Sequence, residues 1–419
     1  MVRGFFCLLF PTFGCMLSHP KSTIPFFAVV MLERWGYYGV RGLFILFIVS
    51  EITAPEEYAI SAFGWGTTII VLGYLIGGIA CRLGTPKMIS LIGLGVQTIA
   101  TLIIAFSYGK EMASLGYILM GIGTGLLRTS ILTFLAQLYQ RSKLLDSAVQ
   151  VNYIMSNIGG FLGGLVIGIV GSLYGFRAGL LLSGIIFLSA FTVLCFTIAV
   201  KSELTPEREK PVKGNVLIVL LAVVLIAVSF LVYDNATANI DYFLSTTDML
   251  VLAEFPVFSW DYVSAIATAI LGIALAIFYS YKKVATTIQL TIGCICAAIA
   301  YVILLAGFEG ARGESISTFF IGFYALESLA TLFIRAPLEA YVVRKFDIRY
   351  SPLIIGLIYI VIMLVPEVGA ITTFENSAIT LSLTVAIFLA FAVIFIGLYF
   401  RYKQKIENES ELLDTPIQL

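Results

Sequence analysis

The feature that most constrains this chain is a succession of long apolar segments, each able to cross a lipid bilayer as a helix. About 20 residues suffice for one crossing, because an α-helix rises 1.5 Å per residue. Sixty per cent of the 419 residues are hydrophobic and 12% are charged, and the mean hydropathy is +1.01. These values lie far outside those of soluble domains. The chain is therefore predicted to be an all-α polytopic (multi-pass) integral membrane protein.

The apolar segments and the basic residues between them predict a topology. Only Lys110, Arg177 and Arg312 fall in outer loops if the N-terminus is cytoplasmic, whereas 18 of the 25 basic residues fall in inner segments and the other four within spans. This imbalance predicts twelve spans with both termini in the cytoplasm. The predicted spans are about 25–50, 57–80, 86–107, 112–139, 147–170, 177–199, 214–238, 260–280, 286–306, 316–341, 351–371 and 377–400.

A hydrophilic stretch in the middle, KSELTPEREKPVKG, separates the sixth span from the seventh. Its two prolines and high charge density are typical of a linker. Two six-helix bundles joined by a cytoplasmic linker are the layout of major facilitator transporters. We therefore predict five parts: a cytoplasmic segment 1–23, a bundle 24–200, a linker 201–213, a bundle 214–401 and a cytoplasmic tail 402–419. Residues 1–15 are either an extra cytoplasmic or interfacial segment or the product of an upstream start codon, with Met16 as the alternative beginning.

Composition also narrows the function classes. The formal net charge is zero and the pI is near 6.6, so bulk charge gives no sign of a nucleic-acid partner, and none is expected. The six cysteines lack metal-ligand spacing, and the single histidine, His19, precedes the first span, which rules out an HExxH metalloprotease. We expect no catalytic residues, no metal and no bound cofactor, and hence no enzyme.

The first span carries three charges, Glu33, Arg34 and Arg41, inside an otherwise apolar run. Charges at that depth cost a few kcal/mol each, so they must face protein or water, and the default interpretation is a functional site. From the helix rise, Glu33 and Arg34 lie about 13 to 15 Å from the inner end and Arg41 about 25 Å from it.

Two other spans place polar residues near the level of Glu33. Arg128 on the fourth span lies about 24 Å from its outer end, and Asn157 on the fifth span lies about 15 Å from its inner end. Glu33, Arg34, Arg128 and Asn157 would then form a net positive central cavity. Guanidinium groups bind carboxylates in a bidentate manner, so this cavity would suit a small solute that bears a carboxylate.

Two further carboxylates are candidates for gating or coupling. Asp234 on the seventh span lies about 30 Å up, close to Arg41, so the two would close an outer gate as an ion pair. Arg41 is also a candidate substrate-binding residue. Glu327 lies near the midpoint of the tenth span without an intrahelical partner, which makes it a candidate proton or substrate carboxylate. The alternative for all these charges is a structural one: they are ties between helices that neutralise buried charge.

Several segments resemble one transporter family. ERWGYYGVR, residues 33–41, is similar to the E-R-F-x-Y-Y-G-x-R signature of proton-coupled oligopeptide (POT/PTR) transporters, and GTGLLRTSI, residues 123–131, resembles their G-T-G-L-F-K-P-N-I. NYIMSNIGGFLGG and YGFRAGLLLSGI resemble two further motifs of the N-terminal half, whereas the C-terminal half is only suggestive. The resemblance implies a major facilitator fold, a peptide carboxylate and a proton-coupling network held near Glu33, Arg34 and Arg128, and substrate hydrogen bonds from Tyr37 and Tyr38.

The chain departs from the family pattern where protons are handled. Val30 replaces the leading glutamate of the first span, Arg128 replaces a lysine and stays charged, and Leu332 falls where the family has a carboxylate. Either coupling uses Glu33 with Asp234 or Glu327, or the chain moves another substrate or exchanges solutes without protons.

The sequence thus predicts a secondary transporter of the plasma or inner membrane that moves di- or tripeptides, or a related carboxylate-bearing solute, by alternating access. A proton gradient is the expected energy source, since no ATP-binding motif occurs. The alternatives are a facilitator or exporter of another organic anion or drug-like solute, and a transport-dead receptor or scaffold of the same fold. We expect a monomer whose partners are the bilayer and a small-molecule substrate.

Overall fold

The computed structural model describes residues 23–139, 144–197, 216–246, 260–310, 315–346, 350–369 and 378–413. Within those ranges every regular element is a helix and no strand occurs. Ten helical runs are long and apolar enough to cross a membrane, and α3 (Ile24–Ser50) and α14 (Ser351–Gly369) bring the number of spans to twelve. The predicted all-α, twelve-span fold is confirmed. The cytoplasmic placement of the termini stays a prediction.

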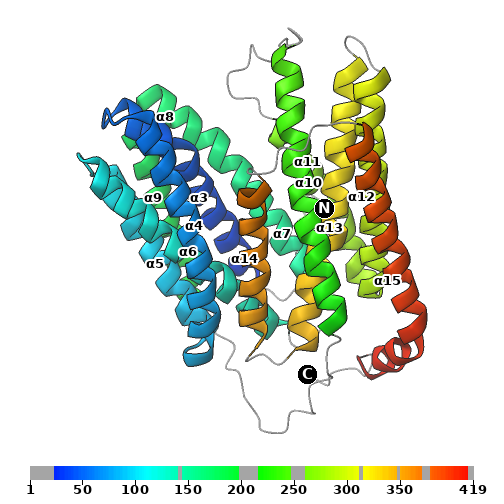
Figure 1. Cartoon of the computed structure of the whole chain (residues 1–419). Coiled ribbons are helices and arrows are strands. Elements are labelled where there is room, and N and C mark those ends of the chain that lie inside the picture. Colours follow the sequence, from blue (N-terminus) through cyan, green and yellow to red (C-terminus); the bar gives the residue numbers. More distant parts are fainter. Residues whose placement is uncertain are drawn as a thin grey trace, which may run out of the picture. The chain divides into compact units, whose positions relative to one another are not determined.

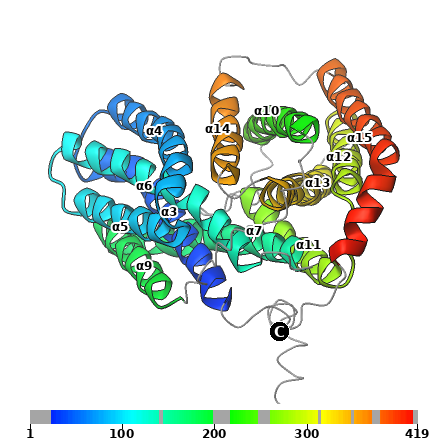
Figure 2. The ribbon, with the colours of Figure 1, turned by 90° about the horizontal axis from the view of Figure 1, so that it is seen from below.

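Contacts divide the chain into two compact units, of which unit 1 comprises residues 1–138, 151–213 and 345–364. In it α5 packs on α6 and α9, α4 packs on α6, and α3 packs on α9 (Figure 2). Its helices besides α3 and the first part of α14 are α4 (Glu56–Leu83), α5 (Pro86–Ala105), α6 (Lys110–Leu138), α7 (Leu145–Leu162), the π-helix η2 (Gly163–Ile167), α8 (Gly168–Tyr174) and α9 (Phe176–Phe196) (Figure 1).

Unit 2 comprises residues 139–150, 214–344 and 365–419. The main packing partner of α15 in it is α12. The last span was predicted to end near residue 400, but α15 continues to Leu413, where the sequence is rich in Lys and Glu, both good helix formers. The helices of unit 2 are α10 (Val216–Thr246), α11 (Trp260–Tyr281), α12 (Thr286–Gly310), α13 (Ser315–Lys345) and α15 (Ala378–Leu413).

The units differ from the predicted bundles 24–200 and 214–401 in two short segments, and the bundles stay a prediction. The first turns of α7 group with unit 2, where Arg344 donates to Asp146 Oδ1 at 2.6 Å. Gln150 Nε2 donates to the carbonyl of Leu332 at 2.9 Å. Pro337, five residues further along α13, lacks an N–H and so leaves the carbonyl of the adjacent Phe333 without its helical donor.

The second segment that differs from the predicted bundles is the first part of α14, which packs in unit 1. A Cβ added to Gly78 would lie 3.0 Å from Leu353 Cα, and one added to Gly356 would lie 2.8 Å from the carbonyl oxygen of Tyr74. Only glycine permits helices to approach this closely. The close approach brings α14 against α4 and positions its aromatic residues for the site described below.

One arginine holds three helices of unit 1 together at their ends. Gly175, with φ of 93°, makes the turn between α8 and α9. Two residues on, the backbone N–H and the Nε of Arg177 donate to the carboxylate of Glu51, at 3.1 and 2.8 Å. Its other two nitrogens donate to the carbonyls of Ala105 and Ser107, each at 2.9 Å. These bonds fix the start of α9 against the ends of α3 and α5.

The contact between α4 and α6 gives a stability prediction. A Cβ at Gly125 would lie 2.2 Å from the carbonyl carbon of Gly73 and 2.4 Å from its Cα. Backbone atoms cannot move aside as a flexible side chain can, so Gly125→Ala should force the two helices apart. We expect the free energy of unfolding to fall by about 1–3 kcal/mol, measured by thermal or denaturant unfolding in detergent.

The matched control is Gly64→Ala on α4. An added Cβ there meets nothing within 4 Å, so this substitution should leave stability unchanged or raise it slightly. Equal effects of the two substitutions would contradict the close backbone contact.

Candidate functional site

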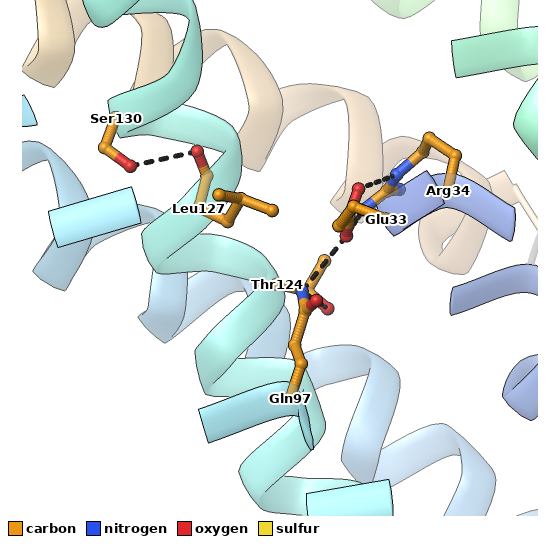
Figure 3. Close-up of polar contacts among 6 residues, drawn as sticks. All are labelled: Glu33, Arg34, Gln97, Thr124, Leu127 and Ser130. Atoms are coloured by element: carbon orange, nitrogen blue, oxygen red, sulfur yellow. Dashed lines mark hydrogen bonds and ion pairs between the residues drawn. The ribbon is translucent and has the colours of Figure 1, made fainter. Parts of the chain in front are cut away.

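A buried polar cluster joins α3 to α5 and α6 (Figure 3). The carboxylate of Glu33 accepts two hydrogen bonds from the guanidinium of Arg34, one of them from Nε at 2.5 Å. Gln97 Nε2 on α5 donates to Glu33 Oε1 and to Thr124 Oγ1 on α6, each at 3.0 Å. Glu33 and Arg34 are only 2% and 3% exposed. Glu33 and Arg34 therefore face protein and neutralise each other.

The geometry of this cluster fits the structural alternative, in which Glu33 and Arg34 are ties between helices that neutralise buried charge. A buried charge with a partner and further hydrogen bonds avoids the cost of an unpaired one. The neutral amide of Gln97 adds a donor without adding charge and links three helices. Roles of Glu33 and Arg34 in coupling and substrate binding stay predictions.

Two tyrosines of α3 surround the guanidinium of Arg34. Its central carbon lies 4.5 Å from the ring centroid of Tyr37 and 6.0 Å from that of Tyr38. Both distances are within the range of a cation–π interaction. Tyr37 is buried, whereas Tyr38 is 40% exposed. Tyr38 is thus the more accessible of the two predicted substrate-contacting hydroxyl groups.

Arg128 lies one turn after Thr124 on α6 and differs from Arg34 in its surroundings. Its Nε is buried and has no hydrogen-bond partner, and none of the ion pairs among the described residues includes it. The guanidinium carbon lies 5.7 Å from the ring centroid of Tyr359 on α14, which itself packs against Tyr74 at 5.3 Å. A buried donor without an acceptor is costly. Arg128 is therefore a cationic group suited to an acceptor from outside the chain.

Asn157 on α7 does not join the cluster by a direct hydrogen bond. Its Nδ2 donates to the carbonyl of Tyr153 at 2.9 Å, within its own helix. The neighbouring backbone nevertheless lies against α3, because a Cβ added to Gly159 would lie 2.2 Å from the carbonyl oxygen of Met31 and 2.8 Å from Arg34 Cβ. The structure thus brings α7 to the predicted place and directs the Asn157 amide group to its own backbone. A role of Asn157 in substrate binding stays a prediction.

Of the two residues in the predicted outer gate, the structure describes the side chain of Arg41 and not that of Asp234. The guanidinium carbon of Arg41 lies 5.5 Å from the ring centroid of Phe63, and Tyr37, Tyr38 and Tyr117 are its polar neighbours. The side chain of Asp234 lies outside the described residues. The pairing of Arg41 with Asp234 and a substrate contact of Arg41 therefore stay predictions.

Glu327 lies on α13 in unit 2. It is 5% exposed, and its Oε2 has no hydrogen-bond partner. The next residue, Ser328, contacts Ser264 on α11 through a hydroxyl–hydroxyl hydrogen bond of 2.9 Å. Glu327 is thus a buried carboxyl group, and the hydroxyl of the adjacent Ser328 bonds to Ser264.

The sequence did not single out three residues of this site. Gln97 and Thr124 complete the Glu33 cluster, and Tyr359 covers Arg128. An amide side chain in the middle of an apolar span was the available signal for Gln97, since such groups need a partner in a membrane. In the part of the chain that the structure describes, no three His, Cys, Asp or Glu residues gather to hold a metal ion.

Comparison with known proteins relates these features to peptide transporters. No protein-family model matches the chain. Dipeptide and tripeptide permease B of Xenorhabdus bovienii is 25% identical over 244 residues, which cover 56% of this chain and 50% of the permease. The di-/tripeptide transporter of Lactococcus lactis subsp. lactis is 24% identical over 240 residues, covering 53% and 48%. The chain spans about half the length of the curated relatives it matches.

Solved structures match over almost the whole chain. The POT family transporter PepTSo superposes with a TM-score of 0.58 at 15% identity, covering 92% of this chain and 99% of that one. A mutant of the peptide transporter POT in complex with alafosfalin gives 0.58 at 16% identity, covering 91% and 95%. The chain is similar in sequence to di- and tripeptide permeases over about half of its length, and it shares the fold of the POT peptide transporters. It has their major facilitator fold and is an integral, multi-pass membrane protein.

Two of the three departures from the family pattern, Val30 and Leu332, are buried apolar side chains in the structure. Val30 is 4% exposed and Leu332 is 0% exposed. The side chain of neither can bind a proton, although the Leu332 carbonyl accepts the hydrogen bond from Gln150. Proton binding at these two positions is therefore excluded.

Proposed function

We propose that the protein is a secondary active transporter that moves di- or tripeptides, or a closely related small solute with a carboxylate, by alternating access. The relatives it resembles are named as dipeptide and tripeptide permeases. The proposal assigns no catalytic role to any residue, and the protein works without a bound cofactor. We further propose that it acts as a monomer in the plasma or inner membrane.

The observation that carries the proposal is the guanidinium of Arg128. It is a charged group on a membrane-spanning helix, its Nε has no hydrogen-bond partner, and the ring of Tyr359 lies 5.7 Å from it. Arg34, by contrast, is neutralised by Glu33. A carboxylate of a bound peptide would supply the missing acceptor and the compensating charge.

A proton gradient is the proposed driving force. Buried carboxyl groups are present on both α3 and α13, at Glu33 and Glu327. In membrane spans such groups typically mark ion pathways or proton relays. Arg128 keeps its charge and so cannot exchange a proton, which leaves the carboxyl groups to do so.

The test is uptake of a radiolabelled dipeptide by the purified full chain in liposomes. With an inwardly directed proton gradient, dipeptide should accumulate above its equilibrium level, and dissipating the gradient with an ionophore should stop the accumulation. Uptake to equilibrium that ignores the gradient would remove proton coupling. Absence of uptake under every gradient, together with dipeptide binding, would instead identify a transport-dead receptor.

A facilitator for another organic anion is the second candidate. This candidate is favoured because the carboxylate of Glu33 already accepts hydrogen bonds from Arg34 and Gln97. Glu33 is therefore poorly placed to exchange a proton. Counterflow by a series of monocarboxylates and dicarboxylates, with no response to a pH gradient, would support this candidate over the first.

A further inference from the structure

We propose that Glu327 is a proton-binding site inside unit 2, loaded and unloaded once in each transport cycle. The inference rests on the proposed transport function and deepens it, because it names the group that couples transport to the proton gradient. It also decides between the two roles that the sequence leaves open for this residue, proton carrier or substrate ligand.

The surroundings of Glu327 on α13 are apolar and closely packed. Phe323 and Tyr324, one turn earlier on the same side of the helix, are 0% and 1% exposed. The ring of Tyr233 on α10 stacks on Phe323 with centroids 6.3 Å apart, and the ring of Tyr301 on α12 meets it at 5.4 Å. Two neighbouring helices, α10 and α12, thus pack aromatic rings against this part of α13.

Among the described residues of unit 2, the titratable groups near Glu327 provide no counter-charge. From α12 the thiol of Cys296 interacts with it electrostatically, and from α11 only the hydroxyl of Ser264 approaches its neighbour. Arg335 lies eight residues further along α13, about 12 Å by the helix rise, and pairs with Glu339 at 3.2 Å. Among the described residues, no ion pair includes Glu327. The side chains of Asp234 and Asp241, the two carboxylates of α10, lie outside the description.

The burial of Glu327 selects a proton as its ligand. A charged carboxylate without a cation in such surroundings costs several kcal/mol, whereas a carboxylic acid carries no charge. A hydronium ion that reaches the site gives up a proton, an O–H bond forms on the carboxylate, and water leaves. Only 5% of the residue is exposed, which favours a ligand as small as a proton over the ammonium group of a peptide. Hydration of the site later in the cycle would stabilise the carboxylate and release the proton to water.

Infrared difference spectroscopy tests the proton site independently of transport. When the pH around the full chain in liposomes is raised from neutral to alkaline, the carbonyl-stretch band of a protonated carboxylic acid should disappear. In Glu327→Gln this band should be absent. In the control Glu57→Gln, which removes an exposed carboxyl group in the first turn of α4, the band should persist. A band that survives in Glu327→Gln would overturn the assignment.

Transport measurements test the coupling role. Glu327→Gln should lose gradient-driven dipeptide accumulation and dipeptide-dependent proton uptake while retaining dipeptide counterflow, and full driven accumulation would overturn the proposal. If Glu327→Gln does not fold, Glu327→Asp keeps a titratable group in a shorter side chain and should move the infrared band, and an unmoved band would overturn the assignment. If the parent protein moves no dipeptide, the proposed function fails, and the infrared band still decides whether Glu327 binds a proton.

Discussion

Arg128→Ala is expected to weaken dipeptide binding by about 2–5 kcal/mol, which is at least roughly 30-fold in the dissociation constant. The parent presents a guanidinium with an unbonded, buried Nε, and the peptide carboxylate would be its partner. Alanine removes both the charge and the donors, and the carboxylate would then lie in the site unpaired. Calorimetric titration of the purified protein with a dipeptide measures the change directly.

Three controls make the Arg128 result specific. Arg82→Ala removes an exposed guanidinium that contacts Tyr350 by a similar cation–π interaction, and it should leave affinity unchanged. Arg128→Lys keeps the charge and loses the planar fork, so its loss of affinity should be intermediate. A dipeptide with an amidated C-terminus should bind the parent weakly and be insensitive to Arg128→Ala. Equal affinity of Arg128→Ala and the parent for the free dipeptide would refute the carboxylate site.

Glu33→Ala is expected to lower the free energy of unfolding by about 3–5 kcal/mol. The substitution leaves the guanidinium of Arg34, which is 3% exposed, without its carboxylate, and it leaves the Gln97 amide with one acceptor fewer. Both losses fall in the centre of the packing between α3, α5 and α6. Unfolding in detergent, followed by circular dichroism, gives the measurement.

The matched control is Glu51→Ala, which removes the carboxylate from a more exposed pair. Glu51 and Arg177 have side-chain exposures of 25% and 31%, so solvent screens their interaction and the loss should be near 1 kcal/mol. A double variant, Glu33→Gln with Arg34→Met, should recover much of the stability lost in Glu33→Ala, because no buried charge remains without a partner. Similar losses for the Glu33 and Glu51 single variants would show that burial does not set the cost.

The fold could be predicted from the sequence because the length of an apolar run and the distribution of Lys and Arg are strong, additive signals. The predicted span boundaries differ from those of the helices by only a few residues at most ends. The exceptions are the ends of α10 and α15, which continue to Thr246 and Leu413 through polar segments. In addition, η2 (Gly163–Ile167) interrupts the fifth span within its glycine-rich segment. Helix propensity and glycine content shape these parts, and hydropathy does not report either.

The candidate site could be predicted only in part. Helix rise alone placed the charges of α3, α6 and α7 at related depths, but it gives no direction to a polar side chain. Thr98, Thr133 and Ser229 bond to the carbonyl four residues earlier, whereas Gln97 reaches across to another helix. Asn157, which was predicted beside Glu33, behaves like the first group. Which hydroxyl or amide crosses a helix interface depends on rotation of the helices, and the apolar pattern leaves that rotation poorly defined.

The pairing of Glu33 with Arg34 has a consequence for the response to voltage. Moving one elementary charge through a membrane potential changes its energy by about 2.3 kcal/mol per 100 mV. The paired side chains lie together and carry no net charge, so the field exerts almost no net force on α3 at their depth. Arg128 on α6 carries a charge without such compensation, and a bound carboxylate would cancel it. Arg128 should therefore contribute to the voltage dependence with which the empty carrier reorients, and bound substrate should reduce that contribution.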